Sequence, residues 1–157
     1  PGPGIEMLEL GSGVGLVGLA AAKAGFDVTI TDINPDSLLF IRINILKNGL
    51  EDKSKVAYAD FTKTKLDKRF RYIIGSEVTY LEDTYRPLVK FLGGHIERSE
   101  DAQVVLAKSY KLKATRFFKL AAEEFRIQEQ VIGFKDESGE SDEKHLSNIY
   151  RLLPRKI

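Results

Sequence analysis

The stretch Glu9-Leu10-Gly11-Ser12-Gly13-Val14-Gly15 follows the largely apolar run Ile5 to Leu8, and it decides the fold. It predicts a buried strand that ends in a carboxylate, then a glycine turn, then a helix. Glycine is needed where the backbone turns sharply and approaches a ligand, because it has no Cβ atom. The helix that follows offers unpaired backbone N–H groups to an anionic part of that ligand. The sequence therefore predicts a ligand-binding turn here, made of Gly11, Ser12, Gly13 and Gly15.

Two cofactor classes fit this turn, since Gly13 to Gly18 also matches the dinucleotide pattern G-x-G-x-x-G. Glu9 separates them, because a carboxylate before the turn repels a doubly negative pyrophosphate. The same charge attracts a ligand that carries a sulfonium and an ammonium. The pattern strand-E-x-G-x-G-x-G resembles motif I of class I S-adenosylmethionine (SAM) methyltransferases. This resemblance implies SAM as the cofactor, with Glu9 among its contacts, and leaves a nicotinamide site as the weaker alternative.

Length and composition indicate one globular domain over residues 1–157, with a formal net charge of +1. So small a net charge gives no global attraction to nucleic acid or membrane. The chain has no cysteine, which fits a reducing cytoplasm, and a nuclear location is left open. The longest apolar stretch is far too short to span a bilayer. Because Pro1-Gly2-Pro3-Gly4 stands directly before a core strand, we expect a fragment that lacks an N-terminal segment.

Strand-like and helix-like segments alternate, which is typical of βαβ units in a parallel sheet. Asn34-Pro35-Asp36 predicts a helix start, and Gly93-Gly94 predicts a helix end. The fold class that follows is α/β: a doubly wound, mostly parallel sheet that closes with a C-terminal antiparallel hairpin. The expected strands are 5–10, 26–31, 55–60, 71–77 and 103–108, then 126–134 and 148–153. The expected helices are about 15–24, 34–48, part of 81–92, and one with Phe118, Ala121 or Ala122, and Phe125 on one face.

Polar groups stand at successive strand ends, where ligands of open α/β sheets bind. Asp32 lies about twenty residues past the turn, where a carboxylate can accept two ribose hydroxyls. Asp60 is expected to accept from an adenine amino group, with Phe61 against the ring face. Ser76 closes the fourth strand. The alternatives are a helix-capping or loop role for the two acids and a core role for Phe61.

Glu77-Val78-Thr79-Tyr80 follows the fourth strand, where class I methyltransferases place the groups that meet the methyl acceptor. With motif I, it resembles the seven-strand protein-lysine methyltransferases with a D-x-x-Y motif (methyltransferase family 16). The likeness covers roughly residues 5–120, with Glu77 where the family usually has Asp and Phe61 where Trp is common. It implies that Glu77 orients the acceptor ammonium and takes or relays its proton. Tyr80 would supply a phenol oxygen and a ring face. The alternative is that Glu77 caps the next helix and Tyr80 packs.

The resemblance implies an enzyme whose partner is a lysine-bearing protein substrate of unknown identity, and we expect a monomer. A methyltransferase for small amines, or an inactive cofactor-binding or interaction module, remains open. We expect no metal, because His95 and His145 lie far apart with no companion pattern. Nucleic acid is not an expected partner. A basic stretch and an acidic loop are read as solvated segments (Lys63, Lys65, Lys68, Arg69 and Arg71; Asp136, Glu137, Glu140, Asp142 and Glu143).

Overall fold

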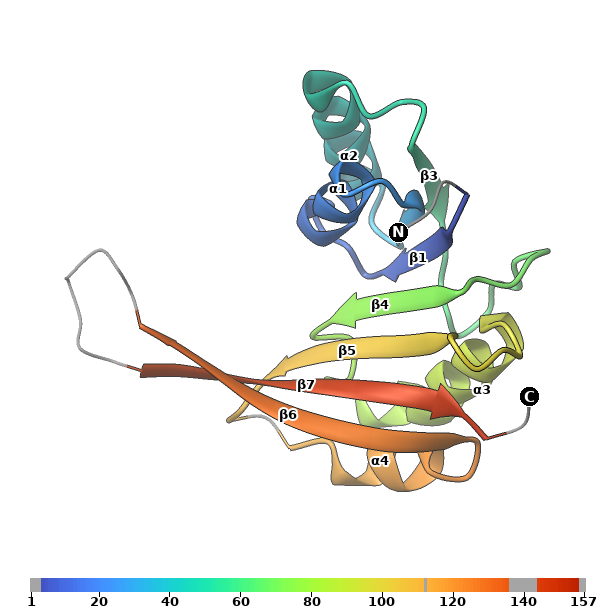
Figure 1. Cartoon of the computed structure of the whole chain (residues 1–157), viewed down its shortest axis with the longest axis vertical. Helices are drawn as coiled ribbons and strands as arrows, with labels where there is room; N and C mark the ends of the chain where they lie inside the picture. Colours follow the sequence, from blue (N-terminus) through green and yellow to red (C-terminus); the bar gives the residue numbers. More distant parts are fainter. Residues whose placement is uncertain (1–3, 112, 136–143, 156–157) are drawn as a thin grey trace.

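A seven-stranded sheet in the order β3-β2-β1-β4-β5-β7-β6 organises the computed structural model (Figure 1), which describes residues 4–111, 113–135 and 144–155. Strands β1 to β5 run parallel, and β7 is antiparallel to both β5 and β6. The strands are β1 (Glu6–Leu10), β2 (Asp27–Asp32), β3 (Ser54–Tyr58), β4 (Tyr72–Ser76), β5 (Gln103–Ser109), β6 (Phe125–Lys135) and β7 (Lys144–Pro154).

Strand β1 lies between β2 and β4, so the strand order reverses beside it. This reversal is the topological switch point, at which open α/β sheets bind their ligands beyond the carboxyl ends of the strands. The register pairs Leu10 with Gly75, which brings the segments that follow β1 and β4 to adjacent places on one edge. The fold therefore puts the glycine turn next to Glu77-Val78-Thr79-Tyr80, which is called the tetrad from here on.

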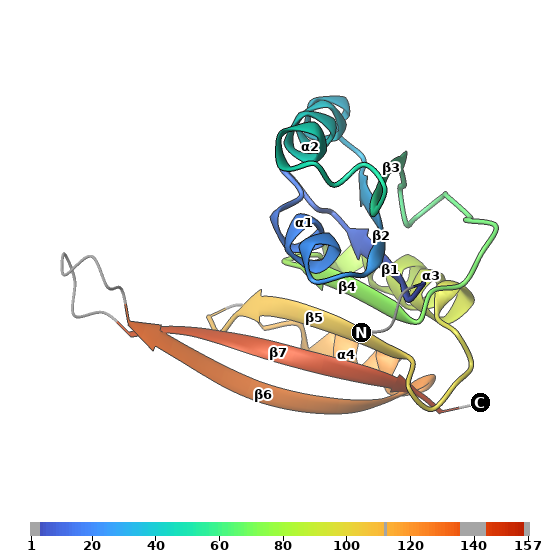
Figure 2. The ribbon, with the colours of Figure 1, turned by 45° about the horizontal axis from the view of Figure 1, so that its top comes forward.

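Helices cover the two faces of the sheet, α1 and α2 on one and α3 and α4 on the other (Figures 1 and 2). Alternation along β1 divides its side chains between these faces. Met7 joins the core under α1 and α2, whereas Leu8 and Leu10 join the core under α3 and α4. The helices are α1 (Leu16–Lys23), α2 (Pro35–Asn48), the 3₁₀ turn η1 (Glu82–Thr84), α3 (Tyr85–His95) and α4 (Thr115–Ala121).

The predicted α/β class, element order and C-terminal hairpin are confirmed. The start of α2 is also as predicted, since Asn34 caps it and its side chain accepts the N–H of Asp36 at 2.9 Å. Both hairpin strands run further at each end than the sequence indicated. Beyond the last β5–β7 pair, Ser109 with Ser147, β6 and β7 pair for three more positions, to Lys135 with Lys144.

Two predicted helix boundaries are wrong. Gly93 and Gly94 lie inside α3, which continues to His95. A Cβ at Gly93 would collide with the Glu124 carboxylate, so this glycine allows close packing and does not end the helix. Helix α4 ends at Ala121, and Phe125 begins β6, so the fully buried aromatic residue of α4 is Phe117. Among the described residues, no helix combines the length and apolar character needed to cross a membrane.

Candidate cofactor and acceptor site

Hydrogen bonds to the end of β2 hold the glycine turn (residues 11–15) in place. The backbone N–H and the hydroxyl of Ser12 both donate to the Thr31 carbonyl, each at 3.0 Å. The Thr31 hydroxyl donates in turn to the Glu9 carbonyl at 2.6 Å. From α2, the Asn44 amide donates to the Val14 carbonyl at 3.0 Å. The turn is thus fixed before any ligand arrives, which lowers the entropy lost on binding.

The three glycines of the turn adopt left-handed backbone angles, with φ of 57° at Gly11, 58° at Gly13 and 82° at Gly15. Such angles are unfavourable for residues that carry a Cβ. At Gly15 a Cβ would also stand 3.2 Å from the Ile41 side chain, whereas at Gly13 it would meet nothing within 4 Å. Gly13 therefore leaves open space over the turn, as a ligand-binding backbone requires, while Gly15 serves the packing of α2.

Glu9 is buried beneath α1, with 4% of its surface exposed. Its side chain shares the face of Met7, and its Oε2 accepts the N–H of Gly18 at 3.0 Å. A Cβ at Gly18 would overlap that carboxylate and come within 2.8 Å of Ile30. Burial raises the pKa of Glu9 to about 7; the Gly18 N–H opposes this rise, and the Asp32 charge adds to it. The structure therefore shows Glu9 supporting α1, while direct contact with a cationic ligand stays a prediction.

Asp32 closes β2 with both carboxylate oxygens facing the backbone around the turn. Oδ2 accepts the N–H of Gly13 at 2.8 Å, and Oδ1 accepts the N–H of Asn34 at 2.9 Å. Each carboxylate oxygen has two acceptor positions, so both can still take a ligand hydroxyl. The structure therefore shows Asp32 holding the backbone around the turn, and the ribose contact stays a prediction.

The residues after β3 are held by local contacts. Asp60 Oδ1 accepts from the N–H of Thr62 at 2.9 Å and from its hydroxyl at 2.6 Å. These bonds, led by the hydroxyl, lower the pKa of Asp60. Phe61 packs against the core under α3 and α4, on the opposite face from α1. The predicted adenine contacts of both residues stay predictions, as does the role of the exposed Ser76.

The tetrad after β4 buries its middle and exposes its ends. Val78 and Thr79 are buried, and the Tyr85 hydroxyl donates to the Thr79 carbonyl at 3.1 Å. Glu77 and Tyr80 are exposed, the latter by 66%. The tetrad thus presents to solvent the two side chains that the sequence predicted as catalytic.

Glu77 has a left-handed backbone angle, φ of 55°, found at no other non-glycine residue of the described ranges. Its N–H donates to the Ala107 carbonyl at 2.9 Å, and its Oε1 accepts the N–H of Ser109. These bonds to β5 offset a conformation that costs about 1–3 kcal/mol. Such strain is concentrated at functional sites, and here it fixes the direction of the carboxylate.

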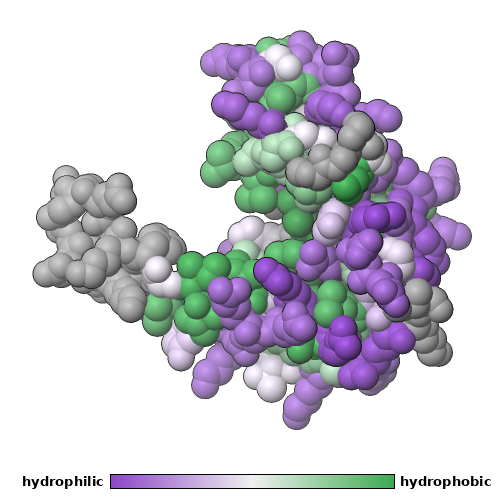
Figure 3. Space-filling view, viewed as in Figure 1, coloured by the Kyte–Doolittle hydropathy of each residue, from purple (hydrophilic) through white to green (hydrophobic). Residues whose placement is uncertain are grey.

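The tetrad lies close against the glycine turn. A Cβ at Gly11 would stand 3.2 Å from the Val78 side chain, so the absence of a side chain there lets the two segments close together. In Figure 3 the surface is indented at this edge of the sheet, between the α1–α2 layer and the hairpin. Candidate cofactor and acceptor groups therefore meet at one place.

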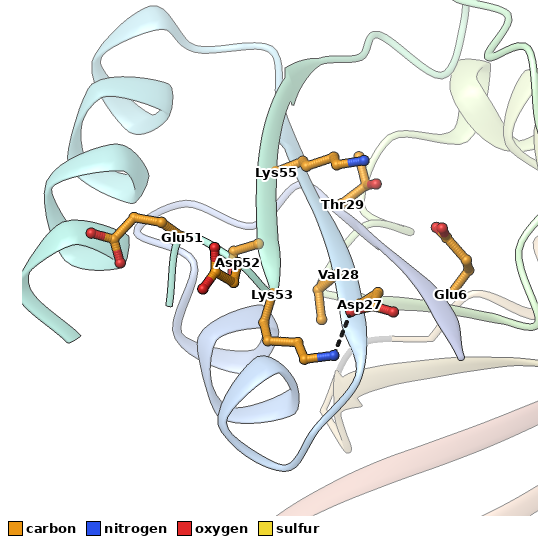
Figure 4. Close-up of a pocket in the computed structure, with 9 residues that line it drawn as sticks. Glu6, Asp27, Val28, Thr29, Glu51, Asp52, Lys53 and Lys55 are labelled. Atoms are coloured by element: carbon orange, nitrogen blue, oxygen red, sulfur yellow. Dashed lines mark hydrogen bonds and ion pairs between the residues drawn. The ribbon is translucent and has the colours of Figure 1, made fainter. Parts of the chain in front are cut away.

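A separate hollow of about 270 Å³ lies at the opposite edge, at the amino ends of β1, β2 and β3 (Figure 4). Four acids and two lysines line it, and Lys53 pairs with Asp27 at 2.8 Å. It faces away from the switch point, so it is not the predicted site. Within the described residues, no three His, Asp or Glu side chains gather as a metal site would require.

Internal contacts engage most of the predicted basic stretch. Lys68 pairs with Glu6, Arg69 donates to the Ile96 carbonyl at 2.7 Å, and Arg71 pairs with Glu97 at 3.1 Å. His95 is buried; its Nε2 accepts the Leu66 N–H at 2.9 Å, and its Nδ1 lies 2.7 Å from the Phe91 carbonyl. These contacts give His95 a structural role. Residues 136–143 of the predicted acidic loop lie outside the described residues.

Comparison with solved structures defines the class of fold. The glycopeptide N-methyltransferase MtfA, in complex with SAM, superposes with a TM-score of 0.75 at 17% identity, over 98% of this chain and 89% of that one. At that identity the likeness shows the fold alone. The architecture is the class I SAM methyltransferase fold, as the element order predicted.

The sequence identifies the family. The lysine methyltransferase family pattern matches residues 3–124, and the chain belongs to this family. The protein N-lysine methyltransferase METTL21A of Danio rerio is 31% identical over 132 residues, which are 80% of this chain and 60% of that protein. The EEF1A lysine methyltransferase 3 of Mus musculus is 28% identical over 160 aligned residues, covering 98% and 64%. The chain therefore spans less than two thirds of these relatives' length.

Sequence reasoning missed two features of the site. Tyr85 anchors the tetrad from α3, and no motif indicates that contact. Lys108 is buried at the end of β5, after Val104 and Leu106 on the same face. The sequence signal for its burial is that it continues the alternate positions that Val104 and Leu106 occupy on the buried face of the strand.

Proposed function

We propose that the protein is a SAM-dependent methyltransferase that acts on a lysine side chain of a protein. The observation that carries this proposal is the close approach of the tetrad to the glycine turn, where a Cβ at Gly11 would stand 3.2 Å from Val78. It puts a cofactor-binding backbone beside an exposed carboxylate and an exposed phenol. Membership of the lysine methyltransferase family supports the choice of acceptor.

The residues present fit this cofactor. Gly13 leaves open backbone, and Asp32 offers acceptor positions to ribose hydroxyls at the end of β2. When bound, SAM supplies an electrophilic methyl group on a sulfonium.

The protein's own contribution is to place a neutral amine in line with that methyl group, since positioning provides much of the rate. A lysine side chain is protonated at neutral pH and must lose a proton before it can attack. Glu77 holds the ammonium and passes the proton toward solvent, and Tyr80 packs its ring against the amine. Transfer from bound SAM would form the new nitrogen–carbon bond as the carbon–sulfur bond breaks, with the electron pair left on sulfur.

We expect SAM and its demethylated product to bind the chain and NAD not to bind. At a pH above its raised pKa, Glu9 places a negative charge near the turn that disfavours pyrophosphate. Isothermal titration calorimetry with the three ligands measures this directly. Binding of NAD without a response to either sulfur ligand would identify a nicotinamide site.

We expect Asp32→Ala to weaken SAM binding by about 1.5–3 kcal/mol, the usual loss for hydrogen bonds to a charged group. It should also lower the melting temperature, because the N–H groups of Gly13 and Asn34 lose their acceptor. Asp36→Ala is the matched control, since it removes an equal charge from an exposed position in α2. Normal affinity in a less stable Asp32→Ala protein would leave Asp32 only its capping role.

The acceptor is tested by incubating a lysate with the protein and methyl-labelled SAM, followed by mass spectrometry. Label on lysine residues of one protein supports the proposal. Label confined to small molecules would support the small-amine alternative. SAM binding without any transfer would indicate a binding module. Cytoplasmic location and monomeric state stay predictions.

A further inference from the structure

Lys108 is the last inward-facing residue of β5, and 4% of its surface is exposed. Val104 and Leu106 precede it on the same face and belong to the core under α3 and α4. Its Nζ is buried and has no hydrogen-bond partner. An unpaired amine in such a place is unfavourable, because it loses water without gaining a partner. A methionine would fill similar space without this cost, so packing alone does not account for the lysine.

Polar groups near Lys108 come from the two strands of the hairpin, β7 and β6. Asn148 of β7 is its direct partner in the register. The Asn148 amide donates to Glu129 at 2.6 Å, and the Tyr150 hydroxyl donates to the same Glu129 oxygen at 2.9 Å. These three residues line a cleft of about 680 Å³ between α4 and the hairpin, with the exposed Lys113 and Lys119 along its α4 side.

Glu77 is bonded to the chain on both sides of Lys108. The backbone bonds of Glu77 go to Ala107 and Ser109, the two neighbours of Lys108 in the chain. Glu77 and Glu129 are the two charges that favour the ammonium form of Lys108. The amine is thus under the influence of both the predicted acceptor carboxylate and a carboxylate of the cleft.

We propose that Lys108 is a positioning residue of the acceptor site, whose buried amine sets the orientation and charge balance of the Glu77 carboxylate. This inference rests on the proposed lysine methyltransferase function. A cation behind Glu77 lowers the attraction of that carboxylate for a second ammonium. The acceptor lysine therefore loses its proton more readily when it reaches Glu77. The proton passes to solvent, and Lys108 keeps its own.

Burial, the largest effect, lowers the pKa of Lys108, whereas the charges of Glu77 and Glu129 raise it. Removing either carboxylate should therefore lower this pKa further. NMR titration of the Lys108 side-chain methylene signals measures it without any methyl transfer. We expect Glu77→Gln to lower the titration midpoint of Lys108. An unchanged midpoint would overturn the coupling between Lys108 and Glu77, even if the protein proved not to be a methyltransferase.

The consequence for the reaction is tested with Lys108→Met. We expect the melting temperature to stay equal or rise, and SAM affinity to stay within about twofold. Single-turnover methyl transfer at pH 7 should fall about tenfold, the equivalent of one pKa unit, and recover at higher pH. Lys108→Arg should restore part of the rate, because it returns the charge. The exposed Lys90→Met is the matched control and should change none of these values.

Two results would contradict this part of the proposal: full activity of Lys108→Met across the pH range, or parallel losses of activity and stability that Lys108→Arg does not restore. A wild-type protein that methylates no protein would contradict the proposed function instead. The NMR titration still decides the link between Lys108 and Glu77 in that case.

Discussion

Glu77→Gln is expected to slow methyl transfer by about two to four orders of magnitude, as is usual when a positioned acid–base group is lost. SAM affinity should be nearly unchanged, because Glu77 belongs to the tetrad and not to the glycine turn. Glutamine keeps an oxygen that can accept the Ser109 N–H, so the strained turn should survive the substitution. Single-turnover methyl transfer to a lysine-bearing protein is the appropriate measurement, since slow product release cannot then mask the chemical step.

Two further variants test whether the loss of rate is specific to the Glu77 carboxylate. Tyr80→Phe should cost less, because the ring remains and only the hydroxyl is lost. Glu82→Gln is the matched control: the residue is an exposed acid five positions along the chain, paired with Arg116 at 3.4 Å. Full activity in Glu77→Gln would remove the carboxylate from the mechanism and leave it only the role of holding the loop on β5.

Glu9→Gln is expected to stabilise the protein at pH 8 by up to about 3 kcal/mol and to have little effect at pH 4.5. The pKa of Glu9 is raised from 4.5 to about 7, so in this window the folded chain holds a proton that the unfolded chain has lost. Folding stability therefore falls as the pH rises from about 4.5 to 7. Glutamine stays neutral throughout and can still accept the Gly18 N–H.

Urea denaturation of both proteins at pH 4.5 and pH 8 measures this difference. Glu51→Gln, at an exposed position, is the control and should show no comparable dependence on pH. Equal stability of Glu9→Gln and the wild type at both pH values would show that Glu9 ionises as it does in the unfolded chain. The stability of α1 would then have to be explained without this buried carboxyl group.

The sequence predicted features that depend on neighbours along the chain. The Asn34 cap, the glycine turn and the alternation of strands and helices all follow from local spacing. The direction of Glu9 could also have been deduced, since it alternates with Leu8 and Leu10 and so shares the face of Met7. Contacts between segments that are distant in the chain could not be predicted in this way. Gly93 looked like a helix end because its packing partner, Glu124, lies 31 positions further along the chain.

In the candidate site, too, some residues could be located from local sequence patterns and others could not. Asp32 and the tetrad stand at strand ends, where a pattern can locate them. Lys108, by contrast, was hidden in an apolar strand, and the meaning of its position depends on Glu77 and Glu129 from other strands. Phe61 was predicted from its place after β3, but the direction of its ring is set by the core under α3 and α4.

The contact between Gly18 and Glu9 restricts the order in which this sequence can change over evolution. A methyl group at residue 18 would meet both the Glu9 carboxylate and Ile30, so alanine there requires these side chains to shift. A smaller residue at position 9 or at position 30 would relieve part of this crowding. Lineages that retain glutamate at position 9 and isoleucine at position 30 are therefore expected to favour glycine at position 18.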